Sequence, residues 1–133
     1  MVVYIMNNVN SLKFGFFYLL LDAIWLFSMT PAFYRPKFEK IQKTKLRFNP
    51  IYAIIAYALL LLTLFAICIP LAQVYPTLHS SLVFAMVGLV VYGVYNMTNA
   101  AVFDHYDVTI CAVDILWGVS SFAMMGLMYE QLR

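Results

Sequence analysis

Two aspartates stand inside long apolar segments of the chain, where an ionised side chain is costly. Asp22 follows the apolar residues 14–21, and Asp114 lies within the apolar segment 108–129. A carboxylate near the centre of a bilayer costs at least about 2.5–3.5 kcal/mol on insertion scales. Each aspartate is therefore expected to face polar partners or water, or to keep its proton. Such groups can bind an ion or perform acid–base chemistry.

Aromatic and amide side chains recur at helical spacing beside these aspartates. The predicted intramembrane polar site comprises Asp22, Trp25, Tyr92, Asn96, Asn99, Asp114 and Trp117. Residues three or four apart share a helix face, so each Asp-x-x-Trp pair should point in one direction. With a rise of about 1.5 Å per residue, Asn96 and Asp114 are predicted at similar depths, with Asp22 about two turns deeper.

The same residues also have a purely structural interpretation. Interhelical hydrogen bonds among Asp, Asn, Tyr and Trp hold membrane bundles together, each contributing typically about 0.6 kcal/mol and occasionally 1–2 kcal/mol. The residue types favour neither a ligand site nor structural hydrogen bonding. We interpret Asp104-His105-x-Asp107 as a polar loop rather than a metal site.

The composition requires a membrane environment for these segments. Of the 133 residues, 65% are hydrophobic and 11% are charged, whereas soluble proteins average roughly 45–50% and about 25%. A soluble fold of this length has too much surface for its volume to bury so many apolar side chains. The sequence therefore predicts an all-α, integral membrane bundle.

Four spans are predicted, near residues 11–34, 50–72, 79–103 and 108–129. No Asp, Glu, Lys or Arg occurs between Phe48 and Phe103, and a span needs roughly 20 apolar residues, so this stretch holds two helices. Pro70, Gln73 and Pro76 mark the break between them. The chain is thus a single transmembrane domain with four helices.

Six basic residues are concentrated in the predicted loop 35–49, namely Arg35, Lys37, Lys40, Lys43, Lys45 and Arg47. By the positive-inside rule this loop is expected inside and both termini outside. The bases alternate with apolar residues, so the loop has a second interpretation as an interfacial helix that binds anionic lipid headgroups.

Several classes of function are disfavoured. The chain has no CxxC, HExxH or Walker motif and no glycine-rich phosphate loop, so we predict no metal, no cofactor and no catalytic residue. Its formal net charge of +2 is too small to indicate nucleic-acid binding. An enzyme is therefore the least favoured hypothesis.

Three motifs resemble those of a family of predicted four-span membrane proteins of unknown function, found in bacteria and some large DNA viruses. They are Asp22-Ala-Ile-Trp25-Leu26, the segment Tyr92-Gly93-Val-Tyr95-Asn96-Met-Thr98-Asn99-Ala100, and Asp114-Ile-Leu-Trp117-Gly118. The resemblance implies the same four-helix arrangement. It implies no particular activity, because none is established for the family. It also implies that Asn96 stands where the family usually has an aspartate, which removes a titratable group.

Two functions remain in competition. The first, narrowly favoured, is a structural or accessory subunit of a larger membrane assembly or of a virion membrane. The second is a small transporter or channel that uses Asp22 and Asp114 and works as a homo-oligomer, because four helices alone seldom enclose a pore.

Overall fold

Helices make up nearly all of residues 6–133, which are the residues that the computed structural model describes. The elements are α1 (Asn8–Met29), the π-helical turn η1 (Thr30–Tyr34), α2 (Arg35–Gln42), α3 (Pro50–Thr63), the π-helical turn η2 (Leu64–Cys68), α4 (Ile69–Val74), α5 (Ser80–Val102) and α6 (Val108–Leu132). They form four continuous helical stretches long and apolar enough to cross a membrane. The predicted all-α bundle of four transmembrane helices is confirmed.

Polar side chains next to the apolar segments start four of the helices. The side chains of Asn7, Asn49, His79 and Asp107 each accept a hydrogen bond from a backbone N–H of the first turn of α1, α3, α5 and α6. These donors have no partner within the helix, so such caps stabilise its start. Pro50 occupies the first turn of α3, where its missing N–H removes no hydrogen bond.

The first helical stretch is longer than predicted. It continues through α2 to Gln42, whereas the sequence suggested an exit at residue 34 and a loop over 35–49. The expectation relied on Pro36, because a proline disfavours helix in the residue before it. The wide turn η1 precedes this proline and carries the chain onward as a helix. The loop proper begins at Lys43, which adopts a left-handed φ of 59°.

Helices α5 and α6 form the closest pair in the molecule. Gly88 of α5 lies against Gly118 of α6, where an added Cβ would stand 2.4 Å from the Gly118 carbonyl oxygen. Gly126 likewise lies against the backbone of Ser81. Small residues of this kind let transmembrane helices approach closely.

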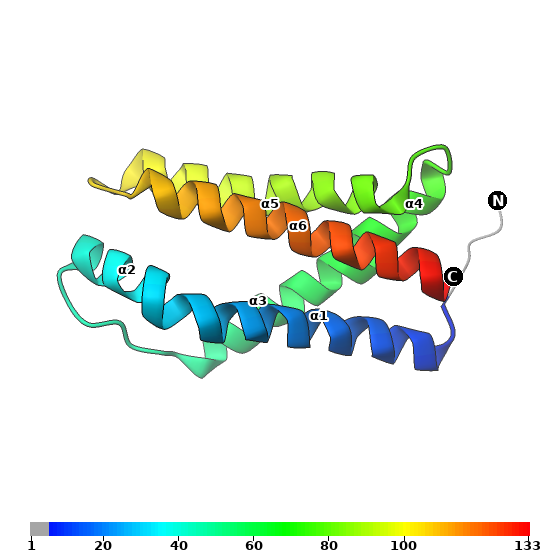
Figure 1. Cartoon of the computed structure of the whole chain (residues 1–133), viewed down its shortest axis with the longest axis horizontal. Coiled ribbons are helices and arrows are strands. Elements are labelled where there is room, and N and C mark those ends of the chain that lie inside the picture. The colour runs from blue at the N-terminus through cyan, green and yellow to red at the C-terminus, as the bar shows by residue number, and fades with distance from the viewer. Residues whose placement is uncertain (1–5) are drawn as a thin grey trace.

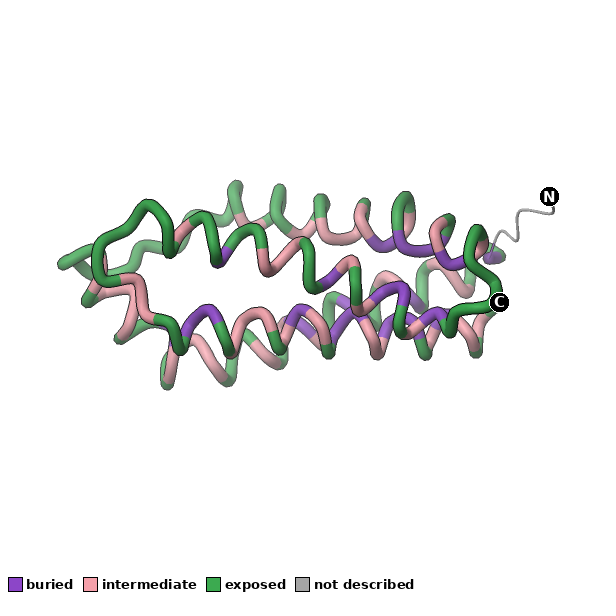
Figure 2. Tube along the Cα trace, turned by 90° about the horizontal axis from the view of Figure 1, so that it is seen from above, coloured by how far each residue is buried: buried purple, intermediate pink, exposed green. Residues whose placement is uncertain are grey.

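The two ends of the bundle differ in how tightly they pack. The start of α1, the end of α6 and the turn between α4 and α5 lie at one end, called here the terminal end, and residues 43–49 and 103–107 lie at the opposite loop end (Figure 1). Most buried positions gather toward the terminal end (Figure 2). The fully buried side chains there include Phe14, Tyr18, Phe84, Phe122 and Tyr129. Which face of the membrane each end meets stays a prediction.

Helix α3 diverges from the other helices toward the loop end. In Figure 1 it crosses behind α1 at an angle, and it buries no side chain. By contrast, η2 and α4, which continue the same stretch, bury Leu64, Cys68, Ile69 and Ala72. The bundle is therefore closed at the terminal end and opens between α1, α3 and α5 toward the loop end.

Candidate functional site

Asp114 on α6 accepts hydrogen bonds from two neighbouring elements. The Asn96 Nδ2 of α5 donates to Asp114 Oδ2 at 2.6 Å, and the Tyr34 hydroxyl of η1 donates to Oδ1 at 3.0 Å. Asn96 is fully buried and also donates to the Tyr92 carbonyl at 2.9 Å. Three helical stretches therefore meet at one carboxylate.

Tyr106, in the loop before α6, closes this cluster from the loop end. Its hydroxyl donates to Asn96 Oδ1 at 3.2 Å. Burial raises the pKa of Tyr106 to about 12, so the hydroxyl stays protonated and keeps donating at neutral pH. Asn99 lies beside the same hydroxyl. Among residues 6–133 it makes no hydrogen bond to Asp22 or Asp114.

Asp22 on α1 belongs to a second, aromatic cluster. Trp117 of α6 donates its indole N–H to Asp22 Oδ1 at 2.9 Å, and the Tyr57 hydroxyl of α3 also interacts with this carboxylate. Trp25 and Trp117 stack face to face, with ring centroids 4.3 Å apart and an interplanar angle of 2°. Asp22 itself is only 5% exposed. The stack and the hydrogen bond together join α1 to α6.

Both carboxylates line one cavity of about 600 Å³, called here the central cavity. Its wall combines the two Asp-Trp pairs with apolar and tyrosine side chains of α3 and α5; the lining comprises Asp22, Trp25, Leu26, Ala53, Ala56, Tyr57, Leu59, Leu60, Thr63, Val91, Tyr92, Tyr95, Asp114 and Trp117. Ligand sites have this character, with apolar walls and a few placed polar groups. The cavity can therefore accept an amphipathic molecule and offer it two carboxylates.

The structure brings six of the seven predicted site residues to the central cavity or its hydrogen-bond network, and Asn99 lies toward the loop end. Sequence spacing missed Tyr34, Tyr57 and Tyr106. Tyrosines are common in apolar segments, so their presence alone does not indicate a functional site. Tyr34 bonds to Asp114, which lies 80 positions further along the chain, and the spacing of residues does not indicate such a distant partner.

The predicted lipid-binding bases occupy different environments. Lys37 forms a salt bridge with Asp107 and stands 5.0 Å from the ring centroid of Phe33. Arg35 lines a groove between α1 and α3. The other four, Lys40, Lys43, Lys45 and Arg47, are exposed at the loop end. Lys37 therefore has a structural role in joining α2 to the start of α6.

One comparison with known proteins gives a match. The model of the predicted membrane protein family DUF2177 matches residues 8–129. The chain belongs to DUF2177. No curated protein and no solved structure matches the chain. The resemblance to a family of predicted membrane proteins is thus confirmed, and in this DUF2177 member the match extends into all four helical stretches.

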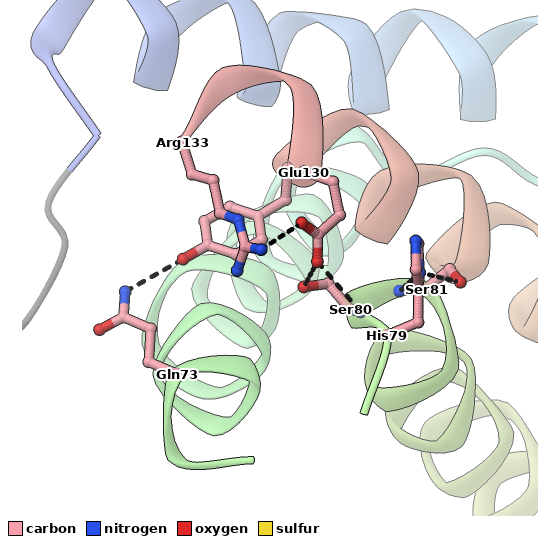
Figure 3. A network of polar contacts seen from close by, with 7 residues as sticks. Gln73, His79, Ser80, Ser81, Glu130 and Arg133 are labelled. Atoms are coloured by element: carbon pink, nitrogen blue, oxygen red, sulfur yellow. Dashed lines mark hydrogen bonds and ion pairs between the residues drawn. The ribbon is translucent and has the colours of Figure 1, made fainter. Parts of the chain in front are cut away.

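A second polar network of this DUF2177 chain lies at the terminal end, away from the central cavity (Figure 3). The Glu130 carboxylate accepts hydrogen bonds from the backbone N–H and the hydroxyl of Ser80, and it pairs with Arg133 at 2.7 Å. Gln73 of α4 donates to the Tyr129 hydroxyl at 3.1 Å. This network ties the start of α5 and the end of α4 to the last turns of α6.

Residues 6–133 contain no group of three or more His, Cys, Asp or Glu side chains that could hold a metal ion. The two cysteines of this part of the chain, Cys68 and Cys111, are free and buried. The chemistry available at the central cavity is therefore that of carboxylates, hydroxyls, amides and indoles.

Asp107 should make stability depend on pH in the acid range. Hydrogen bonds from Lys37 and Thr109 lower its pKa from 3.8 to about 2. Because the folded pKa lies below the unfolded one, this stabilisation is complete above about pH 4 and is lost as the pH falls toward about 2. We expect Asp107→Asn to lower the thermal unfolding midpoint in detergent at pH 7 and to flatten its decline below about pH 4.

Asp104→Asn is the matched control, because Asp104 is an exposed aspartate of the same loop. Equal flattening in both variants would contradict a specific role for Asp107.

Proposed function

We propose that the protein is a small membrane transporter that binds an amphipathic organic cation in the central cavity. The observation that carries this proposal is the placement of Asp22 and Asp114 on the wall of one apolar cavity of about 600 Å³. Volumes of roughly 300–1,000 Å³ are typical of sites for small molecules. Two carboxylates in apolar surroundings select against anions and favour a cation with an apolar body.

The aromatic lining supports the same class of ligand. Trp25, Trp117, Tyr57, Tyr92 and Tyr95 all face the central cavity. A cation held near the face of an indole or phenol ring is attracted to it, by about 2 kcal/mol or more where water is excluded. A hydrated metal ion gains little from such a wall, whereas a quaternary or bulky organic cation gains from both the rings and the carboxylates.

Asp22 is the group that we assign to cation binding. The Asp114 carboxylate is already held by Tyr34 and Asn96, whereas Asp22 contacts Trp117 and Tyr57 on the cavity wall. The indole and hydroxyl donors of these neighbours bring no positive charge to Asp22, and a bound cation would supply it, because a charge in an apolar site is favourable only when it is paired.

The two tryptophans provide a direct test of binding. They are the only two in the chain, and both line the central cavity, so their fluorescence reports on its contents. We expect tetraphenylphosphonium to change the fluorescence of the reconstituted protein saturably. Asp22→Asn should weaken this binding at least about tenfold, which corresponds to about 1.4 kcal/mol, because it removes the charge and keeps an oxygen for Trp117.

The control is Asp104→Asn, which changes the net charge equally at the exposed loop. Uptake of the same cation into proteoliposomes then separates transport from binding. Unchanged affinity in Asp22→Asn, or no saturable binding to the wild-type protein, would overturn the proposal.

A second candidate is a structural or accessory subunit of a membrane assembly. The observation that favours it is α3, which buries no side chain and exposes Ile51, Ile54, Leu59 and Leu62 by more than half. A partner helix that covers this face would complete the bundle. If the protein is such a subunit, Asp22→Asn would change the size of the complex in a bilayer. Neither the wild-type protein nor any variant would then bind the cation.

A further inference from the structure

A groove next to the central cavity runs between α1 and α3. It has a volume of about 790 Å³ and extends from Leu19 to Arg35 along the first helical stretch, with Phe48 and Ala53 on the other side. It adjoins the central cavity, with which it shares Leu26, Ala53 and Tyr57, and it contains neither Asp22 nor Asp114. Apart from Thr30, Arg35 and the Tyr57 hydroxyl, its lining residues are apolar.

Arg35 is the one charged side chain in the lining of this groove. Among residues 6–133 the salt bridges are Lys37–Asp107 and Arg133–Glu130, so the Arg35 guanidinium has no acidic partner there. A guanidinium binds phosphate oxygens through two parallel hydrogen bonds. The unpaired Arg35 guanidinium at the end of an apolar groove favours a ligand that is anionic at one end and apolar along its length.

The dimensions of the groove agree with those of one lipid leaflet. Leu19 and Arg35 are sixteen positions apart, which corresponds to about 24 Å at about 1.5 Å per residue. Half of the hydrocarbon core is about 15 Å thick, and the headgroup region adds to that length. The phosphate of a phospholipid at Arg35 would therefore leave room for an acyl chain along α1.

Two aromatic rings at the groove reinforce this match. Phe27 and Phe48 are 84% and 82% exposed, so the rings extend outward from the two walls. The exposed bases Lys40, Lys43, Lys45 and Arg47 lie at the same end of the molecule as Arg35. Basic residues near a bilayer attract anionic lipids, by about 1 kcal/mol each.

We propose that the groove between α1 and α3 binds one anionic phospholipid of the bilayer, with its phosphate on Arg35 and an acyl chain against Leu19, Ala23 and Phe27. The lipid fills the space that the divergence of α3 leaves open. This site uses neither carboxylate of the central cavity, and it is tested without any cation.

Native mass spectrometry of the protein released from nanodiscs tests this site. The nanodiscs contain phosphatidylcholine with a minor fraction of phosphatidylglycerol of the same acyl chains. We expect the wild-type protein to retain one phosphatidylglycerol per chain in preference to phosphatidylcholine. Arg35→Gln should reduce this preference at least about fivefold. Arg47→Gln, which removes the same charge outside the groove, should leave it nearly unchanged.

A second variant tests the acyl-chain part of the groove. Ala23→Phe keeps every charge and fills the groove beside Phe27, so we expect loss of the retained lipid with unchanged tryptophan fluorescence. Equal effects of Arg35→Gln and Arg47→Gln would show diffuse attraction to the basic end and overturn the site. Retention of the lipid by Ala23→Phe, or equal retention of both lipids by the wild-type protein, would also overturn it.

Discussion

Replacing Gly88 with alanine is expected to destabilise the bundle by about 3 kcal/mol. The new methyl group would stand 2.4 Å from the Gly118 carbonyl oxygen and 2.9 Å from the Phe122 Cβ. These atoms belong to the α6 backbone and to the first carbon of a fully buried side chain, so neither moves without shifting the helix. Overpacking of a tight core typically costs about 1–3 kcal/mol, and more where the backbone must move.

Gly93 on the same helix is the matched control. A Cβ there meets nothing within 4 Å, so Gly93→Ala should leave stability unchanged or raise it by about 0.5–1 kcal/mol. Unfolding in increasing sodium dodecyl sulfate, followed by circular dichroism, measures both variants. Equal stabilities of Gly88→Ala and Gly93→Ala would contradict the close contact between α5 and α6.

Asn96→Leu is expected to cost about 3 kcal/mol for a different reason. The substitution removes the donor to Asp114, the acceptor for Tyr106 and the bond to the Tyr92 carbonyl in one step. The half-buried Asp114 carboxylate loses one of its two hydrogen-bond donors, and leaving a polar group unsatisfied in this way costs about 1–3 kcal/mol, and more for a charged group. The same detergent unfolding assay measures the effect.

A double-mutant cycle separates this loss from simple misfit of leucine. Asn96→Leu with Asp114→Leu removes both polar partners, and replacing both members of a buried pair by apolar groups is often nearly neutral. We therefore expect the double variant to lose less stability than the sum of the two single variants, with the remaining loss due to the Tyr34 and Tyr106 hydroxyls, which no longer have an acceptor. If the two single losses simply add, the contact between Asn96 and Asp114 contributes no coupling energy and the network is not the source of the effect.

The four spans were predictable because the bilayer imposes a simple rule on the sequence. The absence of charge between Phe48 and Phe103 leaves room for two helices, and the proline-containing segment near residue 73 marks the turn. The similar depths of Asn96 and Asp114 follow from helical rise along two neighbouring helices joined by a short loop. Local periodicity and the length of a span were sufficient for both inferences.

Other features depend on contacts that sequence spacing does not encode. Asp22 bonds to Trp117, the tryptophan of the other Asp-x-x-Trp motif, rather than to a residue near its own. The divergence of α3 and the wide turns η1 and η2 likewise have no counterpart in the spacing of apolar residues. A sequence of apolar residues specifies that a helix spans the membrane, but not the angle at which it crosses its neighbours.

The separation of Asp22 and Trp117 by 95 positions has a consequence for biogenesis. During synthesis α1 leaves the ribosome long before α6 exists, so Asp22 enters the bilayer without the indole that later binds it. The apolar remainder of α1 must offset an insertion cost of at least about 2.5–3.5 kcal/mol at that moment. The central cavity is therefore assembled last, and a nascent chain that stops before α6 carries an aspartate in the membrane that lacks its final partner.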